Sequence, residues 1–96
     1  MIASFGDKAT EDLYHGRSTS RVRHFPPDVV AGALRKLDII RAAQRLQDLR
    51  SPPGNRLEAL QGEYVGFYSI RVNQQWRIIF LWENDTAKQV SLIDYH

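Results

Sequence analysis

Three side chains at the end of the chain can together carry acid–base chemistry: the carboxylate of Asp94, the phenol of Tyr95 and the imidazole of His96. The residues before them, 89–93, alternate in polarity and include β-branched side chains, so they are predicted to form a strand buried on at least one face. Such a strand holds the three side chains against a sheet instead of leaving them in a frayed tail. We therefore expect the chemistry of this protein at the end of that strand.

Cationic residues are unevenly distributed, although the formal net charge is only +2. Residues 13–27 hold three arginines and two histidines with no acid, and residues 64–82 hold Arg71 and Arg77 with no acid. A third group of cations lies in residues 35–56, where the only acids are Asp38 and Asp48. Its members are Arg35, Lys36, Arg41, Arg45, Arg50 and Arg56. Two interpretations are open, either solvated helix faces or a basic surface that follows the phosphates of a nucleic acid.

Composition restricts the class of protein. The 96 residues are enough for one domain with a small core, and 43% hydrophobic with 25% charged residues is typical of a globular protein. The sequence has no cysteine, which excludes a disulfide framework and a thiolate metal site and fits a reducing compartment. No apolar run approaches the roughly 20 residues of a membrane span, and no signal-peptide pattern is present. We expect a single cytoplasmic domain over residues 1–96.

The N-terminal half is predicted to be mainly helical. Residues 1–5 are expected to form a short strand, and Thr10 to cap a short helix that ends at His15 and Gly16. Residues 17–25 are expected to be a basic loop. A longer helix is predicted to begin at Pro26 and Pro27, because proline is favoured in the first turn of a helix.

The longer helix is predicted from apolar residues at helical spacing, which are Val30, Ala33, Leu34, Leu37 and Ile40. A break at or just after Asp38 is an open alternative. It would form a helical hairpin with a second apolar face from Ala42, Ala43, Leu46 and Leu49. The Pro-Pro-Gly segment at 51–55 ends the helices in either case.

The C-terminal half is predicted to be an antiparallel meander, because short turns join its strands. Alternation divides the side chains of the two central strands between two faces. One face is predicted to hold Phe67, Ser69, Arg71, Arg77, Ile79 and Leu81, and the other Tyr68, Ile70, Val72, Trp76, Ile78, Phe80 and Trp82. The strands are expected at 56–60, 67–72, 76–82 and 88–95. The fold class is therefore α+β, with N-terminal helices packed on a small antiparallel sheet whose other face is partly open.

Several motifs occur together along the whole chain: Ser51-Pro52-Pro53-Gly54-Asn55-Arg56-Leu57-Glu58-Ala59-Leu60, Ser69-Ile70-Arg71-Val72-Asn73, Gln75-Trp76-Arg77 and Asp94-Tyr95-His96. In this combination the chain resembles the HigB-type toxins of the RelE superfamily (plasmid maintenance system killer family). The first motif is similar to the GraT-like subgroup. The resemblance implies a RelE-like fold of the microbial ribonuclease type and the toxin of a bacterial type II toxin–antitoxin pair.

The resemblance also implies an activity and partners. It implies a metal-independent endoribonuclease that needs no cofactor and cleaves mRNA in the ribosomal A site. The expected partner is a HigA-type helix-turn-helix antitoxin, with which the toxin co-represses their operon, so that operator DNA is bound only through the complex. The ribosome-binding or RNA-binding residues are expected to be Arg35, Lys36, Arg41, Arg45, Arg50, Arg56 and Arg71.

Metal-free RNA cleavage requires a deprotonated 2′-hydroxyl, a stabilised phosphate charge and a protonated 5′-oxygen. The resemblance implies that His96, with an ordinary pKa of about 6.5, is the acid–base group. It implies that Asp94 orients the imidazole, that Tyr95 stacks on a base or donates its hydroxyl, and that Arg77 holds the scissile phosphate. A structural salt bridge for Arg77 and a packing role for Tyr95 are the open alternatives.

Two positions depart from the family pattern. Glu58 and Gln61 stand where some members carry a histidine and a lysine, and the Glu58 carboxylate is expected to repel a phosphate. Arg50 or Arg56 would then compensate, or catalysis would be weak. The departures keep an alternative open, a RelE-fold module that binds the ribosome or RNA with little or no cleavage. A partner that only completes a DNA-binding complex is the third possibility.

Overall fold

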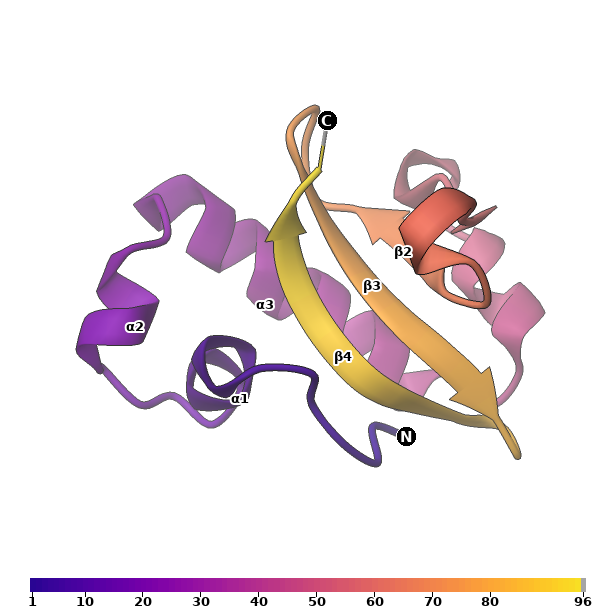
Figure 1. The fold of residues 1–96 in the computed structure, drawn as a ribbon, viewed down its shortest axis with the longest axis horizontal. Coiled ribbons are helices and arrows are strands. Elements are labelled where there is room, and N and C mark those ends of the chain that lie inside the picture. Colours follow the sequence, from indigo (N-terminus) through magenta and orange to yellow (C-terminus); the bar gives the residue numbers. More distant parts are fainter. Residues whose placement is uncertain (96) are drawn as a thin grey trace.

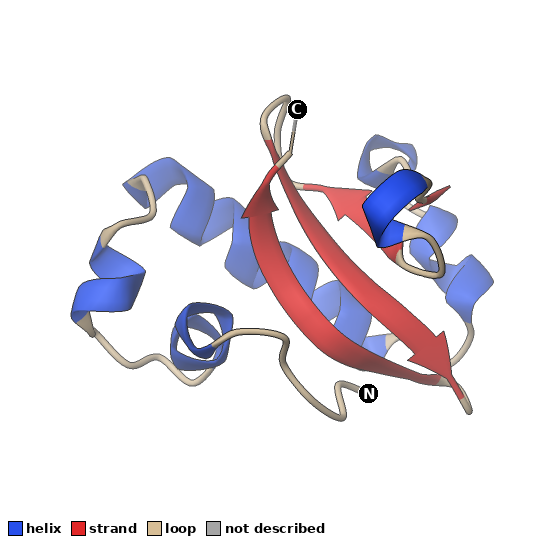
Figure 2. Ribbon diagram, in the orientation of Figure 1, coloured by secondary structure: helices blue, strands red, loops and turns tan. Residues whose placement is uncertain are grey.

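A four-stranded antiparallel sheet forms the centre of the molecule, with the longest helix behind it (Figures 1 and 2). The computed structural model describes residues 1–95. The helices are α1 (Lys8–Tyr14), α2 (Ser20–Arg23) and α3 (Pro27–Ala42), with the 3₁₀ helices η1 (Leu46–Arg50), η2 (Pro53–Asn55) and η3 (Gly62–Tyr64). The strands are β1 (Glu58–Ala59), β2 (Tyr68–Arg71), β3 (Trp76–Glu83) and β4 (Thr86–Asp94).

The strand order β1-β2-β3-β4 confirms the predicted meander. Helix α3 crosses behind the sheet in Figure 1, and its Leu37 and Ile40 meet Ile78 and Phe80 of β3 in the core. All four of these side chains are fully buried. Within residues 1–95, the opposite face of the sheet has no helical layer over β4, and the η3 turn crosses it (Figure 1). The predicted α+β architecture is therefore confirmed.

A bulge in β4 sets which of its side chains reach the open face. Ile79 pairs with Ser91 but Leu81 pairs with Lys88, so β4 contains an extra residue between these pairs. Gln89 lies there with a φ of 52°. An extra residue of this kind shifts the alternation of a strand by one position. Beyond the bulge the even-numbered side chains point to the core, and Tyr95 follows on the open side.

The start of α1 differs from the prediction that Thr10 is its cap. Asp7 caps the helix, and its carboxylate accepts a hydrogen bond from the Thr10 backbone N–H at 2.7 Å. Thr10 is buried, and its hydroxyl accepts from the Leu92 N–H at 2.9 Å, which ties α1 to β4. The predicted strand at 1–5 was also wrong. That segment makes isolated parallel bridges, Ile2 with Ala87 and Phe5 with Val90.

One further helical prediction was wrong, and one open alternative is excluded. The segment 17–25 is not a loop throughout, because it contains α2, capped by the Thr19 hydroxyl, which accepts from the Val22 N–H at 3.4 Å. Helix α3 also continues past Asp38, so the helical hairpin does not form. Leu49 reaches the core from η1 instead. Within residues 1–95, every helix is too short or too polar to cross a membrane.

A buried amide joins η1 and η2 to α3. Asn55 is fully buried, and its Nδ2 donates to the carbonyls of Leu49 at 3.1 Å and Ser51 at 3.2 Å. Its Oδ1 accepts from Lys36 Nζ at 2.5 Å. Burial, together with the charge of Arg35, lowers the pKa of the Lys36 ammonium. These contacts fix the loop that leads directly into β1.

Candidate active site

Arg77 lies at the centre of the open face, on β3 between β2 and β4. Its register partners are Arg71 and Ile93, as predicted for neighbouring strands. The guanidinium Nη1 donates to Ser69 Oγ at 2.8 Å, and Nη2 lies 3.3 Å from Glu58 Oε1. Only 14% of the side chain is exposed. The strands therefore hold this guanidinium in one orientation beneath the surface.

Glu58 reaches Arg77 from the edge of the sheet. It lies on β1 opposite Ser69, so alternation places its carboxylate on the open face. The side chain is 49% exposed, and ion pairs in such hydrated positions contribute only about 0–1 kcal/mol. Sequence reasoning treated this acid as a source of repulsion and missed that it is the ion-pair partner of Arg77. The register of β1 against Ser69 would have been needed to find it.

One aromatic ring lies against Arg77 on the side of β4, and a second ring lies near the first. The Cζ atom of Arg77 lies 5.4 Å from the centroid of the Tyr95 ring, which is a cation–π contact. The Tyr95 backbone N–H donates to the Gln75 carbonyl at 2.7 Å, so the ladder continues one residue beyond β4. Tyr64 of η3 lies 6.5 Å from the Tyr95 ring centroid, at an angle of 44°. Sequence reasoning did not single out Tyr64.

Asp94 and Tyr95 lie on opposite sides of the strand end. Asp94 is the register partner of Trp76, which packs against the helical core, whereas Tyr95 contacts Arg77 on the open face. The Asp94 carboxylate accepts from Gln75 Nε2 at 2.9 Å. The structure therefore brings Arg77 and Tyr95 together on the open face. It places Asp94 on the other face of the strand end, beside Gln75. His96 lies outside the described residues, and its role stays a prediction.

Apart from Arg71, the register partner of Arg77, the predicted RNA-contacting cations lie on other parts of the molecule. Arg35, Arg41 and Arg45 are exposed on the helical side, and Arg41 pairs with Asp38 at 2.8 Å. Lys36 Nζ donates a hydrogen bond to Asn55 Oδ1. Arg71 is half-buried and its Nε donates to the Asn73 carbonyl at 3.0 Å. Two more cations, Arg50 and Arg56, line a groove beside η1.

The part of the chain that the structure describes contains no group of three histidine, aspartate or glutamate side chains able to hold a metal ion. The metal independence of the chemistry stays a prediction. The described cluster offers an oriented guanidinium, a hydrated carboxylate and a tyrosine ring. These groups can bind a phosphate, accept a proton and stack on a base.

Comparison with known proteins identifies the family. Residues 3–96 match the family model described as "RelE-like toxin of type II toxin-antitoxin system HigB". The chain belongs to this family. Toxin HigB-1 of Vibrio cholerae is 45% identical to this HigB-like toxin over 87 residues, covering 91% of the chain and 90% of the relative. Endoribonuclease HigB of Proteus vulgaris is 31% identical over 96 residues, covering all of both chains.

Solved structures support the fold of the HigB-like toxin. A YoeB–YefM complex from Staphylococcus aureus aligns with a TM-score of 0.61 at 18% identity, covering 100% of this chain and 98% of the other. YafQ from Escherichia coli aligns with a TM-score of 0.52 at 15% identity, covering 92% and 87%. The predicted HigB family and RelE-like fold are confirmed. The GraT-like subgroup stays a prediction.

Proposed function

We propose that this HigB-like toxin is a metal-independent endoribonuclease that cleaves mRNA on the ribosome. The observation that carries the proposal is the setting of Arg77, a largely buried guanidinium held by Ser69 and bounded by Glu58 and Tyr95. A displaceable carboxylate on an oriented guanidinium marks a site where another anion can bind. The name of the Proteus vulgaris relative, an endoribonuclease, supports phosphodiester as that anion.

The proposed reaction is attack of the 2′-hydroxyl on the adjacent phosphorus. Arg77 donates to a non-bridging oxygen and stabilises the charge that develops there. Glu58 moves from the guanidinium to the 2′-hydroxyl and accepts its proton as the oxygen–phosphorus bond forms. His96 gives a proton to the 5′-oxygen as its bond to phosphorus breaks, and Asp94 orients the imidazole. The products are a 2′,3′-cyclic phosphate and a 5′-hydroxyl.

The ribosome supplies the alignment in this proposal. Correct placement of the 2′-hydroxyl and the phosphate can contribute roughly 7–11 kcal/mol, more than one side chain of this small site. Tyr95 stacks on one base of the codon, and the exposed arginines of the helical side contact ribosomal RNA. These exposed arginines are Arg35, Arg41 and Arg45, and Arg41 is also paired with Asp38.

An antitoxin is the proposed partner outside the ribosome. The family is defined by toxins of type II toxin–antitoxin systems, and the aligned Staphylococcus aureus structure is a toxin–antitoxin complex. We infer a HigA-type helix-turn-helix antitoxin that neutralises the toxin and carries the complex to the operator of their operon. The chain works in the cytoplasm, where both partners are found.

A second candidate function is supported by the Glu58–Arg77 ion pair itself. The Glu58 carboxylate is already paired with the Arg77 guanidinium. If this carboxylate is never displaced by a phosphate, the chain would bind RNA or the ribosome with little or no cleavage. Both candidates predict inhibition of translation. They differ in whether the message is cut.

Single-turnover cleavage of an mRNA on programmed ribosomes tests the proposal. We expect cutting in the A-site codon, a 2′,3′-cyclic phosphate on the upstream product, and no cutting when the scissile nucleotide is 2′-deoxy. The same mRNA without ribosomes should be cut far more slowly. Intact message on stalled ribosomes would favour the non-cleaving module, and equal cutting of free mRNA would exclude ribosome dependence.

A further inference from the structure

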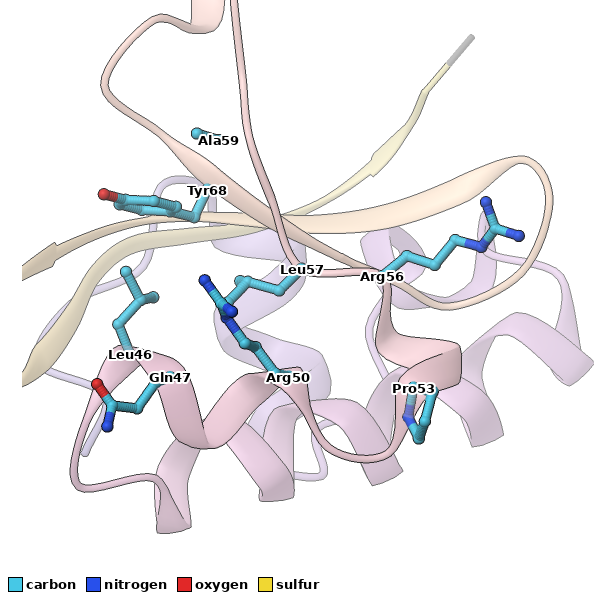
Figure 3. A pocket seen from close by; sticks show the side chains of 8 residues that line it. All are labelled: Leu46, Gln47, Arg50, Pro53, Arg56, Leu57, Ala59 and Tyr68. Carbon is cyan, nitrogen blue, oxygen red and sulfur yellow. The ribbon is translucent and has the colours of Figure 1, made fainter.

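A groove on the other side of β1 from Arg77 has the chemical features of a nucleotide-binding site. It has a volume of about 680 Å³ and lies between η1 and the β1–β2 edge of the sheet (Figure 3). Apolar side chains form much of its lining, and polar groups from η1 and β2 complete it. The lining residues that bear on nucleotide binding are Leu46, Gln47, Arg50, Leu57 and Tyr68.

Arg50 contributes an uncompensated positive charge to this groove. The residue is exposed, and no hydrogen bond or ion pair joins its side chain to another residue in the described range 1–95. Figure 3 shows its side chain rising from η1 toward the sheet, beside Leu57. A guanidinium whose donors are unused, next to an apolar surface, is suited to hold a phosphate that carries an apolar or aromatic group.

Tyr68 supplies the aromatic surface. One side of its ring packs toward Phe80, with ring centroids 6.4 Å apart and an angle of 30°. The ring is half-buried and also lines the groove, above Leu46 in Figure 3. Gln47 adds an exposed amide, which can donate to and accept from the edge of a base. Single-stranded RNA is recognised by aromatic stacking and by hydrogen bonds to base edges.

We propose that this groove binds one nucleotide of single-stranded RNA, with its phosphate on Arg50 and its base between Tyr68 and Leu46. The inference rests on the proposed ribonuclease function and adds a second RNA subsite to it. Glu58 and Ala59 are successive residues of β1, so their side chains point to opposite faces. Glu58 contacts Arg77, and Ala59 lines the groove.

The shape of β1 makes the two sites continuous. This strand is only two residues long and forms the edge of the sheet. An RNA strand that passes around this short edge therefore reaches both Arg77 and Arg50. An acidic peptide would match the charge of the groove, but it would not account for the continuity with the Arg77 site.

Binding of a fluorescently labelled 2′-O-methyl RNA octamer to the purified toxin tests the proposal without cleavage. Replacing Arg50 by alanine should weaken binding about tenfold and reduce the salt slope by about 0.7, as expected for one lost phosphate contact on a single strand. Arg56→Ala is the matched control. It removes the same charge from the groove lining, but Figure 3 shows its side chain pointing away from Arg50. Its effect should be clearly smaller.

Nuclear magnetic resonance supplies a second readout. The side-chain amide signals of Gln47 should shift when the octamer is added to the wild-type toxin and stay unchanged in Arg50→Ala. Equal losses of affinity in the two arginine variants, or an unmoved Gln47 amide in the wild type, would overturn the proposal. Perturbation of Gln47 by the antitoxin but not by RNA would assign the groove to a protein partner instead.

The outcome is separable from that of the proposed function. Cleavage on ribosomes combined with Arg50-independent octamer binding would reject the groove and keep the ribonuclease. Arg50-dependent binding without any cleavage would keep the groove as an RNA site and reject the ribonuclease.

Discussion

Two arginine–carboxylate clusters in this molecule have opposite arrangements. Around Asp12 the carboxylate is buried, with 2% of its side chain exposed, and its partners Arg17 and Arg21 are 51% and 56% exposed. In the pair of Glu58 and Arg77 the guanidinium is the less exposed member, at 14% against 49% for the carboxylate. The carboxylate is therefore the buried member of the Asp12 cluster, whereas the guanidinium is the more buried member of the Glu58–Arg77 pair.

This difference in burial distinguishes a structural cluster, around Asp12, from the proposed anion-binding site at Arg77. Asp12 accepts from the Thr19 hydroxyl at 3.1 Å and contacts Arg17 at 3.3 Å and Arg21 at 3.5 Å, which ties α1 to the segment of α2. A buried carboxylate without these cations would be costly, so the cluster does not exchange partners readily. A largely buried guanidinium whose anion is hydrated can instead accept a different anion.

The largest expected effect is that of Arg77→Ala. Loss of one oriented donor to a developing oxyanion should lower single-turnover cleavage on ribosomes by about 10²–10³-fold, which corresponds to about 2.7–4 kcal/mol. Arg77→Lys should recover only part of the rate, because an ammonium lacks the planar fork. Arg17→Ala removes the same charge from the Asp12 cluster and should cleave normally. Unchanged cleavage in Arg77→Ala would make this arginine structural.

The next effect concerns the exposed partner of Arg77. If the Glu58 carboxylate accepts the 2′-hydroxyl proton, Glu58→Gln should slow cleavage by about 10²-fold or more. The same change removes an anion from the guanidinium, so a non-cleavable RNA should bind more tightly than to the wild type. Opposite changes in rate and affinity are the signature of this dual role. Tighter binding with faster cleavage would show that Glu58 only competes with the phosphate.

Strand alternation was enough to predict which face of the sheet carries Ser69 and Arg77, the face of the candidate active site. Ser69 and Arg77 were expected on one side of the central strands and Ile70, Ile78 and Phe80 on the other, and the structure confirms both. The alternation is set by backbone geometry alone, so it can be read from the sequence. The partner of Glu58 could not be predicted in this way. The register of β1 depends on the loop fixed by Lys36 and Asn55, which are far apart in sequence.

The N-terminal errors have a similar origin. Asp7 and Thr10 are both suitable helix caps, and local sequence does not choose between them. The choice follows from a tertiary contact, because the Thr10 hydroxyl is needed by the Leu92 N–H of β4. Helix α2 was missed because a single turn has little propensity of its own. Its cap residue Thr19 is held in place by Asp12, a contact that only the folded chain makes.

A smaller effect is expected at Tyr95, whose ring contacts Arg77 and lies near Tyr64. Stacking of a base on an aromatic side chain contributes about 1–3 kcal/mol, so Tyr95→Leu should weaken RNA binding and slow cleavage by about tenfold or more. Tyr95→Phe keeps the ring and should behave almost as the wild type. A large loss in Tyr95→Phe, measured in the same cleavage assay, would instead assign the role to the hydroxyl.

The smallest effect on activity is expected for Asp12→Asn, the counterpart of Glu58→Gln in the structural cluster. Burial raises the pKa of the Asp12 carboxyl, but hydrogen bonds from Thr19 and Arg17 and the charges of Lys8 and Arg21 outweigh it, so the pKa lies below its ordinary value. The stabilisation is therefore present above the unfolded pKa of about 3.9 and is lost as the pH falls through the lower folded value.

Urea unfolding at several pH values measures this difference. Asp12→Asn should be less stable than the wild type near neutral pH, and the gap should begin to close as the pH falls below about 4. It should disappear only below the lower folded pKa, where the wild-type carboxyl is protonated as well. Cleavage by the folded variant should be unchanged, since Asp12 has no contact with the open face of the sheet. A stability gap that is constant with pH would show that the Asp12 charge is not what holds α1 to α2. A cleavage defect in the folded variant would remove the distinction between the two clusters.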